Sequence, residues 1–307
     1  MNRNFYYSTV KTLLDQVIQD YCRLTGDDIS NVYQGIAKHI VRTAHQHRNP
    51  DPDIDYFDPL CRFGYLFSHT GANATLFEWS LHLFPSLTKL IGESEGISFC
   101  TVGGGPGTEL LGLAKHLVTH PPTSPKEISF LVLDQVDEWG DTWELLKKAA
   151  KSELRSTGQP GITIEANFKT MDIVDPASYS KYVSLFGDVD VFVFNYLLSE
   201  NQLRIPLFGG ALQEIARRAK SGAYFLVIDR LEQLTSFRND VNDAFLLQGL
   251  TVLQEVEIGN PPNHRMTDDY AALDPYLAAF GNRKPRQWFR DWKTQVPTVF
   301  ALLAQKA

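Results

Sequence analysis

The stretch Ile97-Ser-Phe-Cys-Thr-Val-Gly-Gly-Gly-Pro-Gly-Thr-Glu109 carries more structural information than any other segment of this sequence. Its apolar first half is typical of a buried strand. Gly103, Gly105 and Gly107 follow at every second position and allow the backbone to approach a bound ligand closely. Apolar residues at helical spacing then extend to Val118. Strand, glycine turn and helix together predict a site where helix N-terminal amides face a ligand.

The spacing of the glycines bears on which ligand binds. A dinucleotide fingerprint has the form G-x-G-x-x-G. Here the third glycine, Gly107, comes one residue early, and Thr108 stands at the expected position. A tight turn without a ligand is the structural alternative, since such turns use glycine in any case.

A second apolar run, 128–133, has the pattern of a buried strand and ends at Asp134. A carboxylate at the tip of a second strand can accept hydrogen bonds from both hydroxyls of a ribose. A solvated loop or a helix cap is the alternative for this residue. Trp139 follows closely, and its ring could stack on a base or belong to the core.

Three further runs, 162–168, 190–194 and 223–228, also read as strands. Asp172 follows the first of them, and Asn195 follows the second.

The order of these motifs over residues 97 to 305 resembles that of class I S-adenosylmethionine-dependent methyltransferases. The resemblance implies an α/β fold with a doubly wound, seven-stranded, mostly parallel sheet in the order 3-2-1-4-5-7-6. The runs 250–258 and 298–304 would supply the last two strands. Residues 1–92 would form an N-terminal helical cap that roofs the cleft, ahead of a Rossmann-like domain at 93–307 with an insertion at 260–297.

S-adenosylmethionine is the cofactor that the resemblance implies. In the family, the acid after the second strand holds the ribose, an acid after the third bonds adenine, and the fourth strand tip faces the methyl group. Many members also carry an acid where this chain has Thr101, so Glu109 or a backbone carbonyl would have to contact the methionine amino group. The expected cofactor-binding residues are Thr101, Gly103, Gly104, Gly105, Gly107, Glu109, Asp134, Gln135, Met171, Asp172, Asn195 and Tyr196.

Methyl transfer to a neutral acceptor can need a general base. The candidates are His69, Tyr65, Tyr196 and Glu200. We predict that His69 lies in a polar turn, Ser68–Asn73, between helices at 60–67 and 74–84. Each candidate also has a structural alternative: a surface or capping histidine, core tyrosines, and a glutamate that opens a helix.

The composition limits the partners of the chain. A formal net charge of −7 disfavours a broad nucleic-acid footprint, although the basic and aromatic stretch 283–293 keeps an RNA substrate open. The sequence has no apolar run near 18 residues and no signal-peptide core, so we expect no membrane contact. Cys22, Cys61 and Cys100 form no even disulfide set and no zinc spacing, so we expect a cytoplasmic protein without a metal.

The sequence thus predicts a methyltransferase that acts on an unidentified acceptor, with a small molecule or protein side chain favoured. Two alternatives stay open. One is a non-catalytic partner subunit of the same fold that binds S-adenosylmethionine, and the other is a nicotinamide-dependent oxidoreductase.

Overall fold

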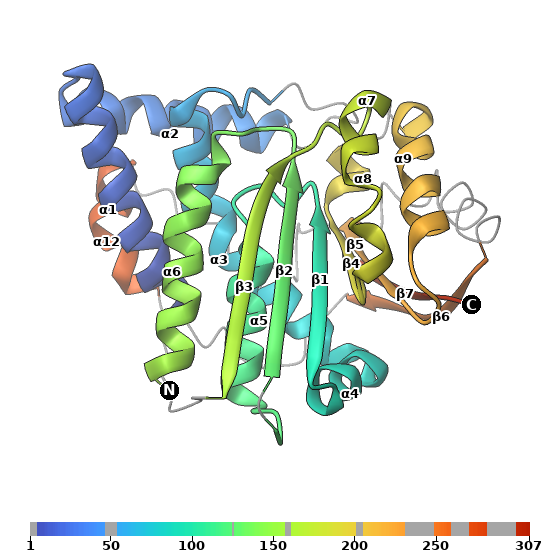
Figure 1. Ribbon diagram of the computed structural model, residues 1–307. Helices are drawn as coiled ribbons and strands as arrows, with labels where there is room; N and C mark the ends of the chain where they lie inside the picture. The colour runs from blue at the N-terminus through green and yellow to red at the C-terminus, as the bar shows by residue number, and fades with distance from the viewer. Residues whose placement is uncertain are drawn as a thin grey trace.

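The computed structural model describes residues 5–46, 54–124, 126–156, 161–200, 205–230, 249–258, 270–280 and 299–307. Within them, the strands form one sheet in the order β3-β2-β1-β4-β5-β7-β6, which confirms the predicted order (Figure 1). Neighbours pair in parallel except β7, which is antiparallel to both β5 and β6. The strands are β1 (Gly96–Val102), β2 (Lys126–Asp134), β3 (Ile162–Thr170), β4 (Val191–Asn195), β5 (Tyr224–Arg230), β6 (Leu250–Ile258) and β7 (Val299–Lys306).

The helices of the described residues begin with α1 (Phe5–Thr25), α2 (Ile29–Gln46), α3 (Pro59–Leu83) and α4 (Pro85–Glu93), all ahead of the first strand. The helices α5 (Thr108–Thr119) and α6 (Trp139–Ser156) follow β1 and β2. The remaining helices are α7 (Pro176–Tyr179), α8 (Leu197–Glu200), α9 (Ile205–Arg218) and α12 (Asp274–Ala279). None of these described helices combines the length and apolar character needed to cross a membrane.

The strand β4 is apolar and buried from Val191 to Phe194, as expected for a strand covered on both faces. Along β4, Val191 and Val193 belong to a core cluster shared with α3, α5 and α6. Phe192 and Phe194 alternate with them and belong to a second cluster shared with α9. This alternation, with a period of two, places the sheet in the middle of a layered α/β fold.

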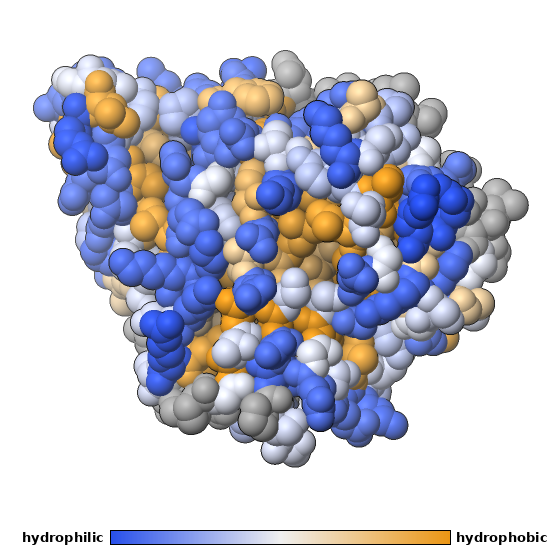
Figure 2. Space-filling view, in the orientation of Figure 1, coloured by the Kyte–Doolittle hydropathy of each residue, from blue (hydrophilic) through white to orange (hydrophobic). Residues whose placement is uncertain are grey.

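The face of β3 that looks toward the viewer in Figure 1 is not covered by a long helix among the described residues. The connection from β3 to β4 has only α7 and short 3-10 turns. Accordingly, Thr163, Glu165 and Asn167 are exposed, while Ile164 and Ala166 are buried on the other face. Figure 2 shows apolar surface over the middle of this side, framed by hydrophilic residues.

The N-terminal helices differ from the prediction at one point. The sequence predicted two helices around a turn at Ser68–Asn73, but α3 runs unbroken from Pro59 to Leu83, so that prediction is wrong. A Cβ on Gly71 would lie 2.8 Å from Cε1 of Tyr7. Gly71 therefore gives α1 room to pack against α3, and the polar residues beside it are helical.

The helices α1 and α3 share one core cluster with the sheet. Phe5, Tyr6 and Leu13 of α1 lie in it together with Phe77 of α3 and Phe130 of β2. The basic and aromatic stretch 283–293 lies outside the described residues. Of the expected insertion at 260–297, residues 270–280 are described, as a 3-10 turn (Tyr270–Leu273) followed by α12.

Candidate functional site

A pocket lies at the carboxyl ends of β1, β2, β3 and β4, where α3 and the loop before it face the sheet. The sheet order reverses direction between β1 and β4, and open α/β sheets bind ligands at this kind of point. The pocket encloses about 740 Å³ of space, including its open mouth. It is lined by Tyr56, Tyr65, Val102, Gly103, Gly105, Asp134, Gln135, Val136, Trp139, Met171, Asp172, Ile173, Val174, Asn195, Leu197 and Glu200.

The glycines of the turn have different roles. Gly103 and Gly105 both line the pocket and have positive φ, at 67° and 51°. A Cβ on Gly103 would lie 2.6 Å from Leu197 Cδ1, so this glycine makes room for a neighbouring side chain. A Cβ on Gly105 would meet only Trp139, at 3.9 Å. Gly105 is therefore the position of the turn where the space in front of the backbone is open.

Asp134 lies at the tip of β2, and backbone amides hold its carboxylate in place. Oδ2 accepts a hydrogen bond from Gly105 N at 2.8 Å, and Oδ1 accepts one from Val136 N at 2.9 Å. Burial raises the pKa of Asp134 to about 6, and the amide hydrogen bonds oppose this shift. Each carboxylate oxygen has a second lone pair, so Asp134 can still accept hydrogen bonds from a ligand.

Three aromatic side chains form one wall of the pocket: Tyr56, Tyr65 and Trp139, which we call the aromatic wall. Their ring centroids lie 5.5 to 5.9 Å apart. Tyr56 comes from the loop before α3, Tyr65 from α3 itself and Trp139 from the start of α6. Such a wall can pack against a flat base, and the faces of its rings attract a cation.

The opposite side of the pocket follows β3. Met171, Asp172, Ile173 and Val174 line it consecutively. Asp172 Oδ1 accepts a hydrogen bond from Val174 N at 3.0 Å, so one of its oxygens fixes the loop. This side combines one carboxylate with apolar side chains.

Asn195 lines the pocket at the tip of β4 and links it to the first turn of α5. Its Nδ2 donates to Glu109 Oε1 at 2.8 Å. The buried Asn195 Oδ1 and Glu109 Oε2 have no hydrogen-bond partner among the described residues. Burial raises the pKa of Glu109, and the bond from Asn195 lowers it. A buried acceptor without a partner at a pocket wall is costly unless a ligand satisfies it.

The tip of β4 continues into a strained residue and a short helix. Tyr196 has a φ of 57°, which is uncommon for a residue with a side chain. Asp229 Oδ2, at the end of β5, accepts hydrogen bonds from Leu198 N and Ser199 N of α8. This cap holds α8, and α8 in turn presents Leu197 and Glu200 to the pocket.

The four candidate bases are not equivalent. Tyr65 and Glu200 line the pocket, whereas His69 and Tyr196 do not. His69 is buried in α3 behind Tyr65, with ring centroids 4.9 Å apart. Burial raises the pKa of Tyr65 well above its usual value, so its phenol is neutral. Asn73 Nδ2 donates to the Tyr65 hydroxyl at 3.0 Å, which leaves the hydroxyl proton available for another acceptor.

The expected cofactor-binding residues fall into two groups. The structure brings Gly103, Gly105, Asp134, Gln135, Met171, Asp172 and Asn195 to the pocket. It places Thr101, Gly104, Gly107, Glu109 and Tyr196 behind these residues, away from the lining. Thr101, for example, is 1% exposed, and a Cβ on Gly104 would lie 2.5 Å from its Oγ1.

Sequence reasoning missed Tyr56 as a site residue. It lies in the proline- and acid-rich stretch before α3, which reads as a plain loop. Its hydroxyl is buried without a partner among the described residues, and burial raises its pKa well above the usual value. Tyr56 and Tyr65 are nine residues apart on either side of a helix start, and this spacing is no recognisable sequence signal for a shared pocket wall.

No protein-family model and no curated protein matches the chain. Among solved structures, the chain is similar to a Listeria monocytogenes protein assigned to the class I S-adenosylmethionine-dependent methyltransferases. The two share 10% sequence identity, the alignment covers 98% of this chain and 88% of that chain, and the TM-score is 0.48. An S-adenosylmethionine-dependent methyltransferase from Clostridium acetobutylicum gives 9% identity, 75% and 91% coverage, and a TM-score of 0.41.

A third similar structure is the plantazolicin methyltransferase BpumL in complex with SAH. It shares 14% sequence identity with this chain, the alignment covers 90% of this chain and 99% of that chain, and the TM-score is 0.45.

Proposed function

We propose that this protein is an S-adenosylmethionine-dependent methyltransferase. The observation that carries the proposal is the carboxylate of Asp134, held by the amides of Gly105 and Val136 and facing a pocket at the β1–β4 switch point. A nicotinamide-dependent oxidoreductase is less favoured, because antiparallel β7 lies between β5 and β6 and the dinucleotide fold has the order 3-2-1-4-5-6.

The pocket residues fit this cofactor. Asp134 would accept hydrogen bonds from the ribose hydroxyls, and Asp172 would accept one from the adenine amino group. Asn195 Oδ1, with the buried Glu109 carboxyl behind it, would accept a hydrogen bond from the methionine ammonium. This arrangement would replace the acid that many members of the family carry at the position of Thr101.

Bound S-adenosylmethionine supplies a methyl group already activated on a sulfonium. The chain then has to align the acceptor and exclude water from the site. The aromatic wall would cover the cofactor and attract its positive charge. Tyr65 and Glu200 are the two candidate bases that line the pocket, and Glu200 is the stronger one because the phenol of Tyr65 is held neutral. The acceptor itself would be a small molecule or a protein side chain.

Two glycines with positive φ give a matched test of cofactor binding. Gly105 lines the pocket, whereas Gly222 has a φ of 82° and open space where a Cβ would stand, with no atom within 4 Å. Gly105→Ala and Gly222→Ala therefore carry similar backbone strain. We expect Gly105→Ala to weaken binding of S-adenosylmethionine and S-adenosylhomocysteine about tenfold or more in calorimetry, because its Cβ enters the ligand space. Gly222→Ala should bind like the wild type.

Two results would contradict the proposal. One is equal affinity in the two variants, and the other is a wild-type protein that binds a nicotinamide cofactor and neither adenosyl ligand. Transfer of a labelled methyl group to pools of small molecules, proteins or RNA tests the activity itself. Cofactor binding without any transfer would favour the non-catalytic subunit instead.

A further inference from the structure

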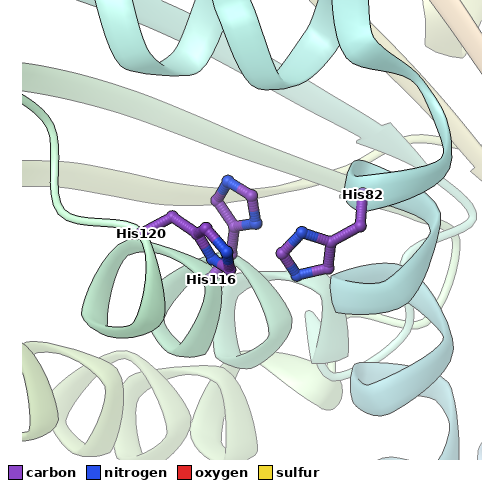
Figure 3. A group of neighbouring side chains, drawn as sticks. All are labelled: His82, His116 and His120. Atoms are coloured by element: carbon purple, nitrogen blue, oxygen red, sulfur yellow. The ribbon is translucent and has the colours of Figure 1, made fainter. Parts of the chain in front are cut away.

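Three histidines, His82, His116 and His120, meet at the far end of α5 from the pocket (Figure 3). His82 is in the last turn of α3, His116 is in the last turn of α5, and His120 caps α5. The ring centroids lie 4.5 to 5.2 Å apart, and one nitrogen of each ring lies within 4.8 Å of the others. We infer that these three side chains bind a divalent d-block metal ion such as Zn²⁺.

The donor set fits such an ion. Imidazole suits zinc, copper, nickel and cobalt, whereas magnesium and calcium require oxygen ligands. Zinc–nitrogen bonds of about 2.0–2.1 Å in a tetrahedron place the nitrogens about 3.3 Å apart. Because His82 and His120 are exposed, small side-chain rotations can close the rings around an ion. Three imidazoles leave the fourth position to water.

His116 supplies an independent observation. Its side chain is 1% exposed, and Nδ1 has no hydrogen-bond partner among the described residues. A bound metal would satisfy this ring, which the protein otherwise buries at a cost.

The surroundings of His120 prepare it as a ligand. Thr119 Oγ1 donates its single proton to the carbonyls of Lys115 and His116, at 3.1 and 3.0 Å. With that proton on a carbonyl, Thr119 Oγ1 can accept a hydrogen bond from His120 Nδ1 across their contact of 2.9 Å. In this tautomer the lone pair is on Nε2, as outer-shell partners of metal-binding histidines arrange it. The C-terminus of α5 also favours a positive charge at this place.

The metal would join the N-terminal helices to the sheet layer. The helices α3 and α5 already touch closely, since a Cβ on Gly112 would lie 2.5 Å from the carbonyl oxygen of Ala74. The twelve residues of α5 span about 18 Å, so the ion would lie far from the pocket and take no part in its chemistry. Its role would be to fix α3, which carries Tyr65, against α5, which starts at the glycine turn.

The test uses the tag-free full chain, stripped of metal with EDTA. We expect one Zn²⁺ per chain, measured by competition with a chromophoric chelator, and a Co²⁺ adduct with the visible band of a tetrahedral site. His82→Gln and His120→Gln replace exposed residues and should fold, yet each should weaken Zn²⁺ binding about tenfold or more. His116→Gln should do the same, and His45→Gln, an exposed position on α2, is the matched control.

Zinc should also raise the melting temperature of the wild type and the control but not of His120→Gln, because an ion that binds only the folded state stabilises it. Absence of stoichiometric binding to the wild type would overturn the inference. Equal affinity in His82→Gln, His120→Gln and the wild type would overturn it as well, since any bound ion would then lie elsewhere. Neither readout depends on the cofactor or on methyl transfer.

Discussion

The carboxyl group of Asp134 is the pocket group whose protonation state we expect to matter most for ligand binding. Its carboxyl is buried with a pKa raised to about 6, and the backbone amides of Gly105 and Val136 orient it. A ligand that donates hydroxyl protons needs the ionised form, because only the carboxylate has all of its lone pairs free to accept. We therefore expect the protonation of this single group to set a lower pH limit for ligand binding.

We expect the affinity for S-adenosylhomocysteine to be constant above pH 6 and to fall about tenfold per pH unit below it, since a proton then competes with the ligand. Calorimetry between pH 7.5 and 5 measures this effect. Glu109 also has a raised pKa, so Asp134→Asn is the necessary control. It should bind about 10- to 150-fold more weakly at pH 7.5, from the loss of a charged hydrogen bond, and show a flat profile. A flat profile in the wild type would exclude this role for Asp134.

At the scale of elements, the contact between α3 and α5 positions the site. The helix α5 starts at the glycine turn, and α3 contributes Tyr65 to the aromatic wall. Gly112 lies where the two helices approach each other closely, and a Cβ there would collide with backbone as well as with Phe77. Backbone cannot rotate out of the way as a side chain can, so the spacing of the two helices depends on this residue.

Gly112→Ala should lower the free energy of unfolding by about 1–3 kcal/mol through overpacking. Its counterpart is Gly92→Ala, at a helical position where a Cβ meets nothing within 4 Å. There the gain in helix propensity should raise stability by about 0.4–1 kcal/mol. Urea unfolding of both variants gives the comparison. A stabilised Gly112→Ala variant would show that the two helices can move apart without a loss in the free energy of unfolding.

At the scale of the whole molecule, the N-terminal segment contributes both to the pocket and to the core. Tyr56 in the loop before α3 and Tyr65 of α3 line the pocket, and Phe5, Tyr6 and Leu13 of α1 belong to the main core cluster. Removing residues 1–58, which include α1, α2 and Tyr56, would therefore uncover apolar surface of α3 and α5 and open one side of the pocket.

We expect a chain that lacks residues 1–58 to lose cooperative thermal unfolding, measured by circular dichroism, because each large apolar side chain of α1 contributes about 1.5–3 kcal/mol by burial. The milder variant Tyr65→Ala should keep its cooperative unfolding transition and lose affinity for the cofactor or the acceptor. A truncated chain that melts cooperatively and binds S-adenosylhomocysteine would instead show that residues 59–307 fold independently.

Most of the fold follows from local patterns. The strands, the glycine turn and the amphipathic helices are encoded by periodicity and turn chemistry among near neighbours, which is why Asp134 could be placed at a strand tip. The sheet order was predicted from the resemblance of the motif order to a known family. The motif around Ser68–Asn73 misled the prediction, because glycine and polar residues signal a turn unless tertiary packing buries them in a helix, as Tyr7 does for Gly71.

The sequence by itself determined which residues end each strand, and hence most of the polar residues that face the pocket. Only the tertiary structure decided that Tyr56 joins the aromatic wall, that His69 lies behind Tyr65, and that Glu109 lies behind Asn195 and is hydrogen-bonded to it. It also brought His82 to His116 and His120, in a chain whose cysteine spacing had indicated no metal. These contacts join segments distant in sequence, and no local pattern encodes a distance that arises only when helices pack on the finished sheet.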